Sequence, residues 1–149
     1  MKFSGKILVS MALLLFACAP VFAQRLQWSA KAVKAGKGLY RVEVTATIPQ
    51  GFHLYDMGSY GEFGPVSTTI SVEPVSNVQC IGAVKAPQSR KYNDAMYGME
   101  IGVYEGTAVF TQMVKAGRRS SVKVKASGMV CSGQTCLPPV SETIELEIK

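Results

Sequence analysis

The sequence predicts an all-β protein that folds as an antiparallel β-sandwich. Apolar and polar residues alternate one by one in several short segments, which is the pattern of strands that bury a single face. Glycine, proline or asparagine separates these segments, and no long stretch has the periodicity of an amphipathic helix. Many short strands divided by turn residues are typical of two packed antiparallel sheets.

The clearest alternation lies in residues 40–48, where the even-numbered residues are apolar and the odd-numbered ones mostly polar. Pro49 and Gly51 follow and end this strand. Pro74 should likewise end the strand predicted before it, because proline cannot donate a ladder hydrogen bond. The other predicted strands are residues 52–55, 68–72, 77–81, 107–114, 121–126 and 143–148.

Two segments break the alternation and are predicted as loops. Residues 57–65 contain three glycines. Residues 85–98 form the longest irregular stretch, and loops of such length are usually functional or disordered. Because the second segment carries Tyr92, Met96 and Tyr97, we expect it to fold against another part of the protein.

Residues 1–23 have the organisation of a signal peptide. Lys2 and Lys6 give a basic start, residues 7–16 are almost wholly apolar, and residues 21–23 form a cleavage site of the A-x-A type. The apolar run is too short, and too soon followed by polar sequence, for a convincing membrane span. We therefore expect an exported, periplasmic protein.

Residues 15–18 also allow a minor alternative, since they resemble a lipoprotein box in which Cys18 would carry a lipid. In both cases we expect residues 24–149 to form a single domain without a transmembrane segment. The formal net charge of +6 falls to +4 without Lys2 and Lys6, and the remaining basic residues are scattered. Because no run of like charges is present, we expect no binding to nucleic acid.

Export also decides how the cysteines are interpreted, because disulfides persist outside the cytosol. The predicted domain holds three, of which Cys80 lies in a predicted strand and is interpreted as a small buried hydrophobic residue. Cys131 and Cys136 have only four residues between them, in a polar turn followed by two prolines. A bridge across so short a loop contributes only about 2 kcal/mol, so we interpret the pair as a reactive dithiol.

With its flanking residues, this pair resembles the N-terminal periplasmic domain of DsbD-type thiol–disulfide interchange proteins. The resemblance rests on the cysteine pair and the Leu-Pro-Pro sequence at residues 137–139, a fairly specific pattern. Two supporting matches are Gly-Phe-His-Leu-Tyr at residues 51–55 and Asp-Ala-Met-Tyr-Gly at residues 94–98, which is similar to the family's cap loop. The resemblance covers about residues 28–148 and implies an immunoglobulin-like β-sandwich.

The resemblance implies an electron relay, a type of protein-disulfide reductase that requires no cofactor. The family domain accepts electrons from a membrane-embedded domain and a thioredoxin-like domain and passes them to oxidised periplasmic thiol proteins. By position, Cys136 would form the mixed disulfide and Cys131 would be the resolving thiol. Because the sequence ends at Lys149, we expect a separate electron donor, either a membrane thiol transporter or a thioredoxin-like protein.

Five further residues are implied to surround the dithiol. His53 and Tyr55 match family tyrosines beside the cysteines, and Asp94 matches an acidic residue that would raise a thiol pKa by like-charge repulsion. Met96 and Tyr97 belong to the cap. Met96 stands where the family has a stiffer aromatic residue, and the two cysteines are closer in sequence than in the best-known members.

Two other functions stay open on the sequence. An exported β-sandwich with a purely structural disulfide could bind a protein or a surface, and the reduction potential of its bridge would distinguish it from a relay. A copper or zinc site could also form from Cys131, Cys136 and His53, completed by Met96 or Met129, although structural zinc usually has a second close ligand pair. A hydrolase is not indicated, because the single histidine is not accompanied by a Gly-x-Ser-x-Gly motif.

Overall fold

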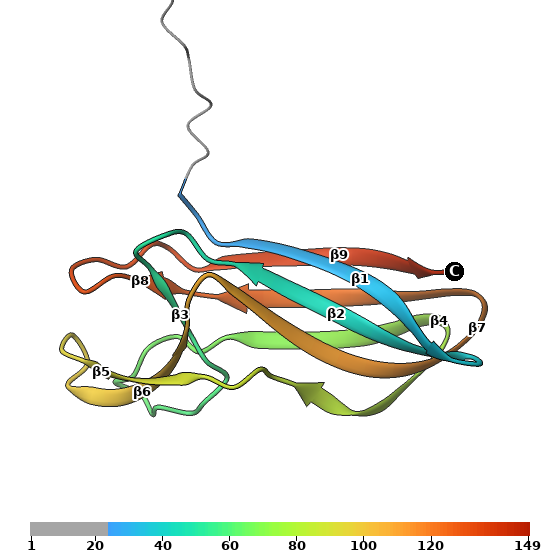
Figure 1. Ribbon diagram of the computed structural model, residues 1–149, viewed down its shortest axis with the longest axis horizontal. Coiled ribbons are helices and arrows are strands. Elements are labelled where there is room, and N and C mark those ends of the chain that lie inside the picture. The colour runs from blue at the N-terminus through green and yellow to red at the C-terminus, as the bar shows by residue number, and fades with distance from the viewer. Residues whose placement is uncertain (1–23) are drawn as a thin grey trace, which may run out of the picture.

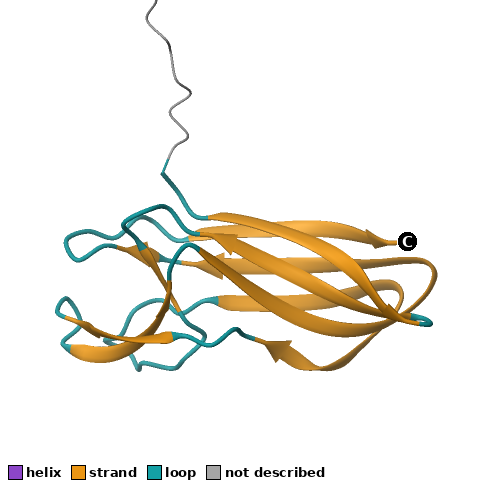
Figure 2. Ribbon diagram, in the orientation of Figure 1, coloured by secondary structure: helices purple, strands orange, loops and turns teal. Residues whose placement is uncertain are grey.

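The computed structural model describes residues 24–149, so the predicted signal peptide and the alternative lipidation of Cys18 lie outside the described residues. All regular secondary structure in this part of the chain is β-strand, and every strand pairing is antiparallel (Figures 1 and 2). The strands are β1 (Gln27–Gly36), β2 (Leu39–Thr47), β3 (His53–Tyr55), β4 (Thr69–Lys85), β5 (Arg90–Asp94), β6 (Met99–Tyr104), β7 (Thr107–Gly128), β8 (Val130–Cys131) and β9 (Val140–Ile148).

Strands β4 and β7 are long because each folds back on itself at the same end of the molecule (Figure 1). Asn77 in β4 and Arg119 in β7 have positive φ angles of 49° and 53° at the two bends. The Asn77 side chain donates a hydrogen bond to the carbonyl of Arg118, and Ser120 Oγ donates one to the carbonyl of Asn77. These bonds join the two bends, so both strands change direction together.

The bends divide the larger sheet into two layers. The first half of β7 pairs with β2, which pairs with β1, while the second half of β7 pairs with β9. Strand β4 follows β7 through both layers. Side chains from both layers meet in one apolar core, among them Val44 and Phe110 from one layer and Val124 and Ile148 from the other. This arrangement is the immunoglobulin-like antiparallel β-sandwich predicted from the sequence.

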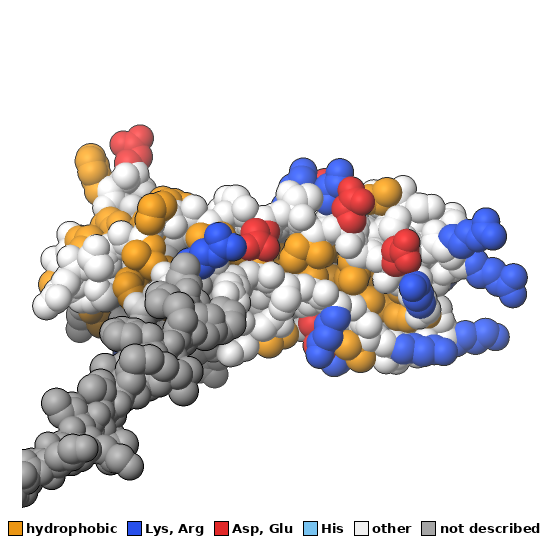
Figure 3. Space-filling view, turned by 90° about the horizontal axis from the view of Figure 1, so that it is seen from above, with side chains coloured by type: hydrophobic (Ala, Val, Ile, Leu, Met, Phe, Trp, Pro, Cys, Tyr) orange, Lys and Arg blue, Asp and Glu red, His pale blue; other side chains and the backbone are white. Residues whose placement is uncertain are grey.

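A second, smaller sheet lies at the end of the sandwich opposite the bends, with the strand order β5–β6–β3–β8 (Figure 1). It has its own apolar cluster of Tyr55, Ile101, Val103, Met129 and Cys131. Figure 3 shows lysine and arginine side chains gathered at the bend end, where Lys37 follows β1 and Arg118 and Arg119 lie in β7. The fold therefore separates a basic end from the end that carries the cysteine pair.

Several predicted boundaries are wrong, although residues 57–65 do form the predicted loop. Pro74 does not end a strand. It lies within β4, opposite Val122 of β7 and next to a shift in strand register. Proline is tolerated at such irregular positions, although it has no N–H to donate to the ladder. The segments at residues 107–114 and 121–126 are two halves of β7. Residues 85–98 are not one long loop, because β4 continues to Lys85 and the polar strand β5 pairs with β6.

Candidate redox site

The cysteine pair closes a tight hairpin that continues from β8. Cys131 and Cys136 are linked by a disulfide with an S–S distance of 2.00 Å and a Cα–Cα distance of 4.0 Å. They face each other as an antiparallel bridge. Backbone hydrogen bonds lie on both sides of this bridge. The N–H of Ser132 donates to the carbonyl of Thr135 at 2.7 Å, and the N–H of Leu137 donates to the carbonyl of Val130 at 2.9 Å. The backbone therefore holds the two sulfur atoms together independently of the covalent bond.

The two sulfur atoms differ in their access to solvent. Cys131 is fully buried, at 0 % exposure, and packs with Tyr55, Ile101 and Met129. Cys136 is only half-buried, at the edge of the same cluster. A thiol or disulfide of another protein can therefore approach Cys136, whereas Cys131 can react only with groups inside the domain.

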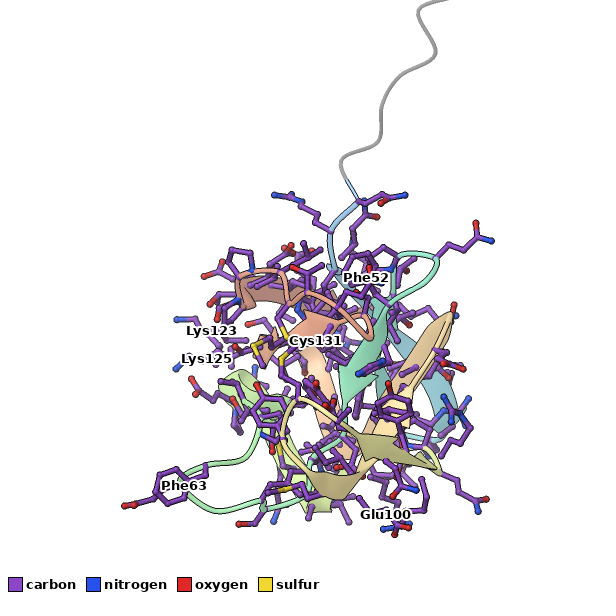
Figure 4. All side chains as sticks on the ribbon, turned by 90° about the vertical axis from the view of Figure 1, so that its left-hand side faces the viewer. Phe52, Phe63, Glu100, Lys123, Lys125 and Cys131 are labelled. Carbon is purple, nitrogen blue, oxygen red and sulfur yellow. A yellow bond between two sulfur atoms is a disulfide. The ribbon has the colours of Figure 1, made fainter. Side chains whose placement is uncertain are left out.

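A single methionine covers the accessible sulfur. Met96 lies in the turn between β5 and β6, and its Sδ is 3.7 Å from Cys136 Sγ. A disulfide sulfur carries no hydrogen, so this is a van der Waals contact between two polarisable atoms. Figure 4 looks onto this end of the molecule, with the sulfur atoms beside Cys131 at its centre and Phe63 projecting outward from a neighbouring loop. The Met96 side chain is itself 51 % exposed, so its cover over Cys136 is partial.

Asp94 fixes the turn that carries this methionine. Its Oδ1 accepts hydrogen bonds from the backbone N–H of Met96 at 2.8 Å and of Tyr97 at 3.3 Å, and its carbonyl accepts one from Gly98 at 2.7 Å. Its Oδ2 accepts a 2.7 Å hydrogen bond from Tyr55 Oη. Burial and this bond to Asp94 raise the pKa of Tyr55, which stays a neutral donor. The buried carboxylate thus ties the cap to β3.

His53 lies between the cap and the buried cysteine. It is directly opposite Cys131 in the β3–β8 pair and is 5 % exposed. Its ring centroid is 5.2 Å from that of Tyr55 and 4.7 Å from that of Tyr92. Its Nε2 is 3.7 Å from Asp94 Oδ2 and has no hydrogen-bond partner within residues 24–149. Burial lowers the pKa of His53, and the nearby Asp94 carboxylate only partly opposes this effect.

The structure thus brings the predicted site residues together around the disulfide and its cap. Sequence reasoning missed a further carboxylate, which lies at the end of β3. Asp56 follows Tyr55 directly, and its carboxylate accepts hydrogen bonds from Tyr60 Oη at 2.5 Å and Ser89 Oγ at 2.8 Å. Burial opposes ionisation of Asp56, but these bonds and one from a backbone N–H outweigh it and lower its pKa. The sequence feature that could have indicated Asp56 is the Asp-x-Gly pattern at residues 56–58, which is typical of a turn and directly follows a predicted strand.

The remaining sequence candidates lie away from the cap. Cys80 is half-buried in β4, its Sγ is 3.4 Å from the carbonyl of Val72, and burial raises its thiol pKa. It forms no disulfide with another cysteine of residues 24–149. In the same part of the chain, no three or more His, Cys, Asp or Glu residues are grouped so as to hold a metal ion. The described residues also include no helix with the length and apolar character needed to cross a membrane.

A β-sandwich that presents a capped disulfide at one end has the arrangement expected of a thiol–disulfide exchange domain. The sequence profile of the N-terminal domain of the thiol:disulfide interchange protein DsbD matches residues 23–148, and the chain belongs to this family. No curated protein sequence matches the chain significantly.

Solved structures of low sequence identity share the fold. The reduced DsbD N-terminal domain of Neisseria meningitidis is 18 % identical with a TM-score of 0.52, and the alignment covers 80 % of this chain and 84 % of that one. The N-terminal periplasmic domain of ScsB from Proteus mirabilis is 20 % identical with a TM-score of 0.58, over 82 % of this chain and 46 % of that one. A chain in a complex of the DsbD and PilB N-terminal domains from Neisseria meningitidis is 15 % identical with a TM-score of 0.54, over 87 % of this chain and 87 % of that one.

Proposed function

We propose that this protein relays electrons in the periplasm by cycling Cys131 and Cys136 between dithiol and disulfide. The donor is a thioredoxin-like protein or a membrane thiol transporter, and the acceptors are oxidised exported proteins. The observation that carries this proposal is the difference between the two sulfur atoms, since one is buried and the other lies under a half-exposed methionine. A bridge with one approachable sulfur suits an exchange that begins on Cys136.

The reaction balances without a cofactor. The Cys136 thiolate attacks a disulfide of the acceptor, which releases one acceptor thiolate and leaves a mixed disulfide. The Cys131 thiol then loses its proton and attacks Cys136 Sγ, which expels the second acceptor thiolate and forms the internal bridge. Two electrons pass to the acceptor, whose two thiolates take up the two protons that the domain loses. The donor drives the same steps in reverse.

Two of the similar proteins support this choice of partner and compartment. One DsbD N-terminal domain is described in a complex with the PilB N-terminal domain, and the ScsB domain is described as periplasmic. The pattern of residues 1–23 supports export in the same way. The alternative of a structural bridge predicts a reduction potential below about −300 mV, whereas a labile bridge has a higher one.

Trapping the mixed disulfide tests the proposal. Reduced Cys131→Ser is incubated with an oxidised thioredoxin-like protein and is expected to accumulate a covalent adduct, because the resolving thiol is absent. Cys136→Ser is the matched control and should form almost none, since Cys131 is buried. Non-reducing mass spectrometry measures both adducts. If neither variant forms an adduct, or if both form it equally, the relay is contradicted.

A further inference from the structure

The resolving step requires that a buried thiol lose its proton. Cys131 is 0 % exposed and packs among Tyr55, Ile101, Val103 and Met129, so solvent water accepts its proton only slowly. Apolar surroundings also disfavour the thiolate, which is the only form that attacks a disulfide. A mixed disulfide on Cys136 would therefore persist unless a base inside the domain serves Cys131.

His53 has the position and the protonation state of such a base. Directly opposite residues of an antiparallel pair point to the same face, with Cβ atoms about 4.5–5.5 Å apart, and His53 is paired with Cys131 in this way. It is the only histidine of the sequence. Burial holds its pKa below the usual value, so the ring is neutral near pH 7 and able to accept a proton.

The Asp94 carboxylate is placed to stabilise the protonated ring. Its Oδ2 lies 3.7 Å from His53 Nε2, and this nitrogen has no other partner in the described part of the chain. The carboxylate favours a hydrogen on Nε2, which leaves Nδ1 as the accepting atom. Once Nδ1 is protonated, the imidazolium and Asp94 attract each other across this short gap. Asp94 cannot turn away, since Tyr55 and the cap backbone hold it.

We propose that His53 is the proton acceptor for Cys131 in the resolving step, and that Asp94 orients and stabilises it; this inference rests on the proposed relay. The Cys131 thiol gives its proton to His53 Nδ1, and the resulting thiolate attacks Cys136 Sγ. The internal disulfide forms, the partner thiolate leaves, and the imidazolium returns the proton to that thiolate. The ring is then neutral again, and no external base is consumed.

The charges around His53 come from a small set of groups. Asp94 and Glu105 favour the protonated ring, while Arg90 disfavours it. The neutral rings of Tyr55 and Tyr92 cover it on two sides. Because burial has the largest effect, the pKa of His53 lies below the usual value for histidine. The ring is therefore protonated, and unable to accept the proton of Cys131, only under acidic conditions.

Ellman's reagent separates the two chemical steps in a single experiment. A Cys80→Ala background removes the third thiol of the described chain, and the reduced protein is mixed with excess reagent. Attack by Cys136 releases one thionitrobenzoate and leaves a mixed disulfide, and attack by Cys131 then releases a second one. The rate of the second release is measured between about pH 5 and pH 9, in this background and with His53→Phe or His53→Gln added.

In both variants we expect the second release to slow about 100-fold at pH 7 while the first release keeps its rate. In the parent protein, the rate of the second release should be constant at pH values above the pKa of His53 and should decrease at pH values below it. The rate of the variants should rise about tenfold per pH unit, because only ionisation by water remains, so the deficit closes toward alkaline pH.

A role for His53 in packing alone predicts a deficit of the same size at every pH, and that result would overturn the proposal, as would the absence of a deficit. Phenylalanine keeps the ring volume and glutamine keeps a polar side chain, so a folded variant is expected from at least one of them. If the parent protein never releases the second thionitrobenzoate, Cys131 is not a resolving thiol, and the relay itself fails rather than only the role of His53.

Discussion

Replacing Met96 by alanine should make Cys136 of the reduced protein react about fivefold faster with an alkylating reagent. Met96 is 51 % exposed, so about half of its side chain is buried over the disulfide and the cap. Complete burial of a methionine contributes about 1.5–3 kcal/mol, which gives about 1 kcal/mol for this half-buried contact. If Cys136 reacts when the contact opens, about 1 kcal/mol corresponds to about a fivefold change in rate.

The alanine variant isolates the side chain, because the cap is held through groups that alanine keeps. Asp94 bonds to the backbone N–H of Met96 and Tyr97 and to Tyr55 Oη. Alkylation by iodoacetamide is followed by mass spectrometry in the Cys80→Ala background. Met57→Ala is the matched control, since this methionine is 38 % exposed in the loop after β3. Equal rates for the parent protein, Met96→Ala and Met57→Ala would refute the view that Met96 shields the sulfur.

Two further predictions concern stability. Burial holds the folded-state pKa of His53 below the usual histidine value of 6.5, so the unfolded chain binds the proton more readily. The free energy of unfolding should therefore fall as the pH drops from about 6.5 through that lowered pKa. In His53→Phe, the free energy of unfolding measured by urea titration should depend less on pH in this range. An unchanged dependence on pH would mean that groups other than His53 cause it. In Gly102→Ala, the new Cβ would clash with Asp56 Oδ2, which is held by its hydrogen bonds, so unfolding in urea should show a loss of about 2 kcal/mol or more. In Gly133→Ala the Cβ meets nothing within 4 Å, and a loss as large as that of Gly102→Ala would contradict the steric argument.

The strands that the sequence predicted well are those with one buried and one exposed face. In β2 and in both halves of β7 the alternation of side chains follows the alternation of burial. Strand β6 was missed because its last four residues are all buried, so no polar face marks it. Strand β1 was missed because it buries mostly alanine beside Trp28 and lies at an edge, where small side chains give a weak signal.

In the candidate site, the sequence predicted the features that neighbouring residues determine, but not the contacts between distant segments. The closeness of Cys131 and Cys136 in sequence, together with the resemblance to a family, was enough to place the disulfide and its cap. The hydrogen bonds of Asp56 were not predictable, because its partners Tyr60 and Ser89 come from two different loops. The pairing of His53 with Cys131 depends on strand register, which a three-residue strand does not fix by its own pattern.

The hairpin geometry also explains how the bond can open without disturbing the sandwich. The hydrogen bonds on both sides of the cysteine pair should remain when the S–S bond is broken, because they join backbone atoms and do not depend on the sulfur atoms. Ser132 Oγ further accepts hydrogen bonds from the backbone N–H of Gln134 and Thr135, which keeps the turn closed. The main structural response to reduction should therefore occur in the side chains of Met96 and Cys136. A scaffold that stays fixed while the cap moves lets a partner protein act on the redox site by displacing one methionine.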